Sequence, residues 1–254
     1  MNHSMTFSET VIISILAAFI PAFITGCIGY ILARSKAKQD FQQWVRQEHS
    51  QAEHYIDTLQ QQYINPLRYW AAALSKRLSE LEEKLKNNSY GQVATWFQQI
   101  KDHADKSNIM TAFPLWCCYE GIFAMTTLYF TCSYLQSARQ IRFRAPFREI
   151  DPDYDHRLQE HLASVGEAFG RSEGIWDSSQ EVIGERFTSS VGKLEFRELS
   201  KILDSHDGFE FTVLLRPIDY YVGHMNTERT KDIGAALTAL LDFVNSRPTP
   251  ELRS

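Results

Sequence analysis

The sequence predicts an all-α protein: a single N-terminal transmembrane helix, followed by a cytosolic helical domain that begins with a heptad-bearing stalk or helical hairpin. Three observations support this prediction. A long uncharged run lies near the N-terminus, apolar residues after it recur at alternating spacings of four and three, and later segments keep a helical period. Residues 209–217 alone have strand character, and because one strand has no partner elsewhere in the sequence we expect a helix or an extended loop there.

The uncharged run extends from Val11 to Ala33. As a helix it would be roughly 34 Å long, enough to cross a hydrocarbon core of about 30 Å. Pro21 in its middle is compatible with a membrane helix, because neighbouring groups there can satisfy the freed carbonyl. Gly26 belongs to a face of small residues that suits contact between membrane helices. We therefore expect a transmembrane helix over 10–34.

Two alternatives exist for this segment, a cleaved signal and a lipid-modified cysteine. A cleaved secretory signal needs a basic start and a shorter apolar core, whereas residues 1–9 contain no Lys or Arg. Residues 24–27, ITGC, match the short pattern that precedes a lipid-modified cysteine, but the chain stays apolar after Cys27. Both alternatives fit the sequence less well than a retained membrane helix.

The charges that flank the run predict its orientation. Arg34, Lys36 and Lys38 follow it closely, and basic residues beside a span stay on the cytoplasmic side. Residues 1–9 are then a short extracytoplasmic N-terminus, and the remainder of the chain is cytoplasmic. The expected location is the inner membrane of a bacterial cell, with a single pass and the lipid bilayer as a partner.

Composition limits the function of the cytosolic part. The whole sequence has 44% apolar and 22% charged residues, which is ordinary for a globular protein, and residues 246–254 are expected to be a flexible tail. The net charge of −5 argues against general nucleic-acid binding. The four cysteines are expected to be free thiols, since the cytosol is reducing.

Residues 35–88 carry two heptad series. The first runs from Phe41 to Leu59 with one flaw at Glu48, and the second begins one residue late, just after Pro66. One long kinked helix or two helices would explain the slip, and the absence of loop residues favours the kinked helix. A stripe of leucines must pack within the domain or against a second copy, so the second series is also a candidate association seam for a homo-oligomer. This association seam comprises Leu67, Leu74, Leu78, Leu81 and Leu85.

Residues 89–245 form the expected helical domain. Its helical periods cover 155–169, 175–187, 194–205 and a last helix from Thr227, and residues 144–156 are predicted to be the longest loop. Residues 113–135 are apolar with one acid, which suits either a second membrane segment or the central helix of a soluble core. Their several Thr, Ser and Tyr side chains favour the core helix.

Four arginines offer a candidate anion-binding or partner-binding site in an otherwise acidic domain: Arg139, Arg142, Arg144 and Arg148. Guanidinium groups bind phosphate and carboxylate bidentately. The alternative is a helix C-terminus, where the dipole favours cations. The acidic stretch 151–161 lacks the glycine and the distal Glu of a calcium loop, so it predicts a helix cap rather than a metal site. We expect no metal and no cofactor.

These observations favour a membrane-anchored, non-enzymatic interaction, sensing or effector module with a protein partner. One alternative is a membrane-perturbing effector of the toxin or antiphage-defence type, in which residues 113–135 also insert. Another is an enzyme that acts on a phosphorylated ligand at the arginine cluster. The sequence assigns no catalytic residue, because it contains no recognisable nucleophile, metal or phosphate-loop motif.

Overall fold

The computed structural model describes residues 34–105, 119–171, 174–186 and 209–246, except 37, 45 and 49, together with 195–197, 199 and 202. The described residues form helices and short turns without a strand, which confirms the all-α prediction. The predicted span over 10–34 and the tail over 246–254 lie almost entirely outside them. No described helix combines the length and the apolar character that crossing a membrane requires.

The chain divides into two compact units, residues 1–55 and 56–254. This division differs from the one drawn from the sequence at residue 88, because the second heptad series belongs to the larger unit. The described part of the first unit is helical, and it exposes three aromatic side chains at more than two fifths of their surface: Phe41, Trp44 and Tyr55.

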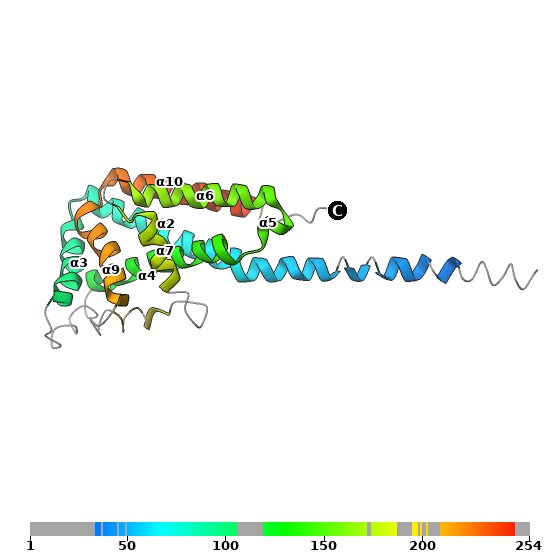
Figure 1. Cartoon of the computed structure of the whole chain (residues 1–254). Coiled ribbons are helices and arrows are strands. Elements are labelled where there is room, and N and C mark those ends of the chain that lie inside the picture. The colour runs from blue at the N-terminus through cyan, green and yellow to red at the C-terminus, as the bar shows by residue number, and fades with distance from the viewer. Residues whose placement is uncertain are drawn as a thin grey trace, which may run out of the picture. The chain divides into compact units, whose positions relative to one another are not determined.

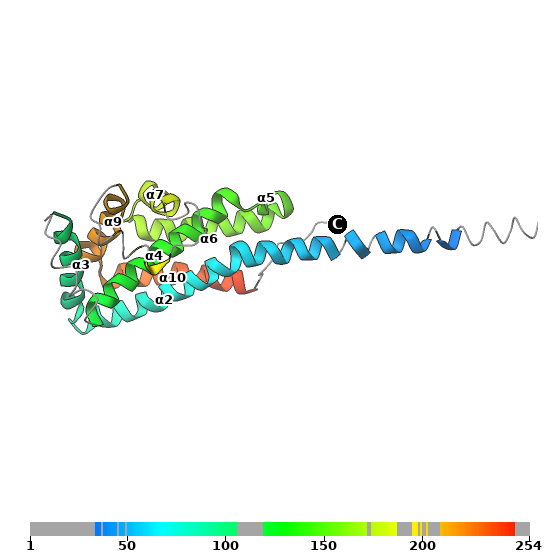
Figure 2. The same ribbon diagram turned by 90° about the horizontal axis from the view of Figure 1, so that it is seen from below.

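The larger unit contains the following described helices in chain order. They are α2 (Asn65–Lys86), α3 (Tyr90–Asp105), α4 (Tyr119–Arg144), α5 (Phe147–Ile150), α6 (Pro152–Gly170), α7 (Asp177–Arg186), α9 (Phe209–Asp219) and α10 (Thr227–Ser246). Helix α10 packs against both α2 and α6, while α4 packs against α2 and α7. Helices α3 and α9 pack together at one end of the unit, and α5 lies at the other end (Figures 1 and 2).

A π-helical turn, η1 (Gln60–Ile64), precedes α2 without a break in the helix. The N–H of Asn65 donates to the carbonyl of Gln60, five residues earlier. Pro66 explains this wider turn, because proline has no N–H and its ring crowds the carbonyl four residues before it. A π turn adds one residue to a helix. The one-residue slip between the heptad series therefore lies at η1, and the helix continues through it.

The leucines of the association seam lie in the interior of the larger unit. Leu67, Leu74, Leu78 and Leu81 are at most 1% exposed, and Leu85 is partly buried against the same core. Helix α2 packs against α4 and α10 of its own chain. The leucine stripe could pack within its own domain or against a second copy of the chain. In the structure it packs within the domain.

Helix α4 is the central helix of this core. Its buried side chains occur all around its circumference, and several are polar. The hydroxyls of Thr127, Thr131 and Ser137 each donate to the backbone carbonyl four residues earlier, at 2.7, 2.9 and 3.0 Å. This bonding satisfies the hydroxyls inside the core. Of the segment 113–135, residues 119–135 belong to this helix, and residues 113–118 lie outside the described part.

The corner between α4 and α6 differs from the loop that the sequence predicts over 144–156. The short helix α5 fills most of it, and its Phe147 is fully buried. Asp151 then caps α6 by accepting a hydrogen bond from the N–H of Tyr154 at 3.0 Å, which is the capping role expected for the acidic stretch. The loop prediction was wrong because the burial of Phe147 stabilises a helical turn there. Residues 209–217, which have strand character in the sequence, belong to helix α9.

Candidate functional site

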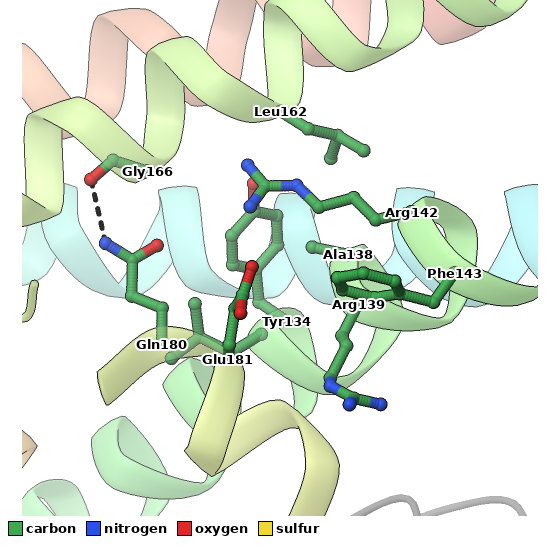
Figure 3. Close-up of a pocket in the computed structure, with 10 residues that line it drawn as sticks. Tyr134, Ala138, Arg139, Arg142, Phe143, Leu162, Gly166, Gln180 and Glu181 are labelled. Carbon is green, nitrogen blue, oxygen red and sulfur yellow. Dashed lines mark hydrogen bonds between the residues drawn. The ribbon is translucent and has the colours of Figure 1, made fainter. Parts of the chain in front are cut away.

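A partly open pocket lies where α4, α6 and α7 meet (Figure 3). It holds about 310 Å³ of space outside atoms, part of it open solvent. Tyr134, Ala138 and Arg142 recur every fourth residue on one stripe of α4, so a single helix face supplies one wall. Ten residues line the pocket: Tyr134, Leu135, Ala138, Arg139, Arg142, Phe143, Leu162, Gly166, Gln180 and Glu181.

Arg142 crosses the pocket from α4 towards α6 (Figure 3). Its Nη2 atom lies 3.6 Å from the position that a Cβ atom would occupy at Gly166, so the guanidinium reaches the surface of α6 where that helix has no side chain. The side chain of Arg142 makes no ion pair or hydrogen bond with any other residue that the structure describes. Its five N–H donors are therefore available to water or to a ligand.

The phenol of Tyr134 points into the same pocket. Tyr134 is 2% exposed, and its hydroxyl has no hydrogen-bond partner among the described residues. Burial raises the pKa of Tyr134 far above its ordinary value, and the positive charge of Arg142 opposes this rise only in part. The group is thus a neutral phenol at physiological pH, able to donate one hydrogen bond and to accept another. A buried hydroxyl without a partner destabilises a fold by about 1–3 kcal/mol.

Gln180 fixes the distance between α6 and α7 at the back of the pocket. Its Nε2 donates to the carbonyls of Gly166 and Ile175 at 2.8 and 2.6 Å, and the side chain is 5% exposed. Both N–H groups of the amide are used in this way, which sets its orientation. Gly166 also permits the close approach, because a Cβ there would lie 3.2 Å from Oε1 of Gln180.

Helices α4 and α7 approach closely at Gly184. A Cβ at this position would lie 2.8 Å from the carbonyl oxygen of Leu135 and 2.9 Å from Cβ of Arg139. Arg139 turns its guanidinium away from Arg142, stacks on the ring of Phe143 at 5.0 Å and pairs with Glu185 at 3.3 Å (Figure 3). The charge of Arg139 is therefore already balanced by a neighbouring carboxylate.

Two carboxylates stand near the unpaired guanidinium. Glu181 extends from α7 into the same space as Arg142 (Figure 3), and the side chain is exposed at the rim. Oδ1 of Asp177, one turn earlier, lies 3.5 Å from the Cβ position at Gly166. Neither forms an ion pair with Arg142. The pocket thus contains separated charges of opposite sign beside an apolar wall.

The structure separates the four arginines that the sequence grouped together. Arg139 and Arg142 line the pocket, whereas Arg144 and Arg148 are exposed outside it. Arg142 and Arg144 occupy the last turn of α4, as the helix-dipole alternative expected. The backbone carbonyl of Arg144 accepts a hydrogen bond from the hydroxyl of Tyr63 at 3.2 Å.

Sequence reasoning missed Tyr134, Gln180 and Glu181. A polar residue on an apolar helix face was the available signal, since Gln180 lies three residues before the buried Ile183. In the described part of the chain, no three or more His, Cys, Asp and Glu side chains group as metal ligands would. Cys132 is a buried free thiol, and burial raises its pKa.

Fold and pocket together define a helical domain with a small charged cavity between three helices. Comparison with protein-family models, with curated proteins and with solved structures finds no match to this chain.

Proposed function

We propose that this protein is a membrane-anchored sensing module whose helical domain binds a small ligand that carries an acidic group. The observation that carries the proposal is the pairing of Arg142 with Tyr134. Both point polar hydrogen-bonding groups into one cavity, and neither group has a partner among the described residues. A carboxylate or phosphate there would accept from the guanidinium bidentately and from the phenol as well.

The membrane anchor in this proposal is supported by the sequence. The uncharged residues 11–33 have the length of a membrane helix, and the basic residues after them favour a cytoplasmic domain. An anchor of this kind keeps the pocket at the inner surface of the membrane. In this proposal, binding there is reported to a protein partner.

Helix α4 bears on the alternative in which residues 113–135 enter the membrane. Residues 119–135 supply much of the buried core of the larger unit, including Phe123, Leu128 and Tyr134. Insertion would withdraw this helix from α2 and α7 and expose their apolar faces to water. The pocket supports ligand binding by a domain that keeps α4 in place.

The test is Tyr134→Phe in the full-length protein, purified in a mild detergent. Removing a buried hydroxyl that lacks a partner should leave the melting temperature unchanged or raise it, while affinity for acid-bearing ligands falls. Tyr221→Phe is the matched control, because Tyr221 is equally buried but its hydroxyl lies 2.7 Å from Oγ1 of Thr131. That control should lose about 1 kcal/mol of stability.

Ligand binding is read from melting shifts with acetate, phosphate and amino acids, since a ligand of the folded state raises its stability. The proposal requires that at least one acid-bearing compound stabilises the wild type and that Arg142→Gln removes the effect. Arg148→Gln changes an exposed arginine outside the pocket and should retain the shift. If no acid-bearing compound binds in a manner that depends on Arg142, the proposal is wrong.

A further inference from the structure

The helical part of the first unit exposes large aromatic side chains on one face. Phe41, Trp44 and Tyr55 are 63%, 55% and 48% exposed, and the ring centroids of Phe41 and Trp44 lie 6.0 Å apart. With 3.6 residues per turn, these three positions fall within about 60° of one another around the helix axis. Exposed apolar surface that is gathered on one face is typical of an interaction site.

The same face carries the first heptad series. Phe41, Glu48 and Tyr55 follow one another at intervals of seven residues, and Val45 and Ala52 lie between them at the alternating spacings of four and three. This repeat keeps one stripe facing a second helix over its whole length, because two supercoiled helices have 3.5 residues per turn relative to each other. The pattern therefore favours another helix as the partner of this face.

The charges of this segment argue against the bilayer as the partner. Residues 39–59 carry one base and four acids: Arg46, Asp40, Glu48, Glu53 and Asp57. Helices that lie on a membrane have Lys and Arg on their polar face, and the anionic cytoplasmic leaflet repels acidic segments. If the helix instead stands upright from the expected span, Phe41 and Tyr55 lie about 12 and 33 Å beyond Ala33, past a headgroup layer of about 5–8 Å.

We infer that two copies of this chain associate in parallel through the face that contains Phe41, Ala52 and Tyr55. The expected membrane anchor gives every copy the same orientation, so the same face of each helix can meet its counterpart. It also confines the copies to one surface, which raises their effective concentration and makes a seam of two heptads sufficient. The inference goes beyond the proposed function, since it uses the anchor and makes no use of the pocket.

Glu48 lies in the middle of this seam and would face Glu48 of the second copy. A charged residue at one seam position lowers the stability of a coiled coil, because the two like charges repel each other. Such a position also disfavours registers that would bury the carboxylate against apolar side chains. The flaw in the heptad series therefore predicts a weak pairing that the membrane anchor supports.

Disulfide crosslinking of the full-length chain in isolated native membranes tests the pairing. Ala52→Cys puts a thiol on the seam, and Ser50→Cys puts one on the opposite side of the helix. Every variant also carries Cys27→Ser, and the parent without an added cysteine measures any crosslink through the other three native cysteines. After oxidation with copper phenanthroline we expect a covalent dimer for Ala52→Cys and none above the parent for Ser50→Cys.

Three further changes, each combined with Ala52→Cys, show whether the exposed face is responsible. Tyr55→Glu should remove the dimer, and Glu48→Leu should raise its yield. Tyr69→Glu is the control, because Tyr69 is a 63% exposed tyrosine on α2, and the dimer should remain.

Equal yields from Ala52→Cys and Ser50→Cys, or no dimer from either in a chain recovered with the membranes, would overturn the inference. A crosslinked product that contains a different protein would overturn it as well. A chain recovered outside the membranes would overturn the anchor, and with it the parallel pairing. Ligand binding at the pocket is tested separately by the melting shifts, so failure of the pairing and failure of the ligand proposal are distinguishable.

Discussion

The closest approach between α4 and α7 allows a stringent test of the packing beside the pocket. In Gly184→Ala the new methyl group would lie 2.8 Å from a backbone carbonyl oxygen and 2.9 Å from Cβ of Arg139. Contacts under 3.0 Å require movement, and here the neighbours are backbone and the fixed base of a side chain. The two helices must therefore separate by several tenths of an ångström.

The size of the effect follows from two opposing contributions. Alanine in place of glycine inside a helix stabilises by about 0.5–1 kcal/mol, because the unfolded chain loses conformational freedom. Overpacking of a close interface costs about 1–3 kcal/mol. We expect Gly184→Ala to be destabilising by about 1–2 kcal/mol, which lowers the melting temperature by roughly 2–8 °C for a chain of this size.

Gly234→Ala is the matched control, because Gly234 also lies within a helix but nothing is within 4 Å of its Cβ position. It should raise the melting temperature by roughly 1–4 °C. Both variants are measured by circular dichroism of the full-length protein during heating. Equal stabilisation by the two substitutions would refute the close packing of α4 on α7, and with it the geometry of the pocket wall.

Three further predictions concern the core, the pH dependence and the membrane topology. Leu74→Asp puts a carboxylate at a position with no exposed surface. The free energy of unfolding should therefore fall by more than the roughly 1.5–3 kcal/mol gained by burying one Leu. The melting temperature of this variant should be lowered equally at all protein concentrations. Burial raises the pKa of Tyr90 and Tyr221 above the ordinary 10.0. The contribution of these two phenols to stability should therefore be constant up to about pH 10 and fall above it, because the unfolded chain loses phenolic protons first. Urea titrations at pH 8 and pH 11 measure this difference in stability. Equal stability at the two pH values would show that these phenols are exposed. A C-terminal alkaline phosphatase fusion should be inactive in cells if the domain is cytoplasmic, and an active fusion would reverse the topology.

The helical framework could be predicted because periodicity reports directly which residues face the core. The stripe from Leu67 to Leu81 has spacings of four and three, and the structure buries each of its leucines. The slip before Pro66 was visible in the sequence too. The sequence alone does not give the cause of the slip, because a π turn and a loop between two helices produce the same one-residue shift in a heptad pattern.

The pocket could not be predicted from sequence spacing, since its walls come from three helices whose relative positions depend on packing. Tyr134 and Gln180 are far apart in the chain, and only the folded structure brings them to one cavity. The predicted arginine cluster lies only in part at the candidate pocket, with Arg139 and Arg142 in the lining. Two of its members are exposed elsewhere, and Arg139 is balanced by Glu185, a partner that sequence spacing does not reveal.

The buried hydroxyl of Tyr134 has a cost in stability. A phenylalanine at position 134 would fill nearly the same space and would avoid a penalty of about 1–3 kcal/mol for a buried hydroxyl without a partner. Domains have only about 5–15 kcal/mol of net stability, so this cost is a large fraction of the total. Folding alone therefore favours phenylalanine at this position. We propose that in the functional state this hydroxyl bonds to an anionic oxygen held by Arg142, whose guanidinium lies in the same cavity and has no partner among the described residues.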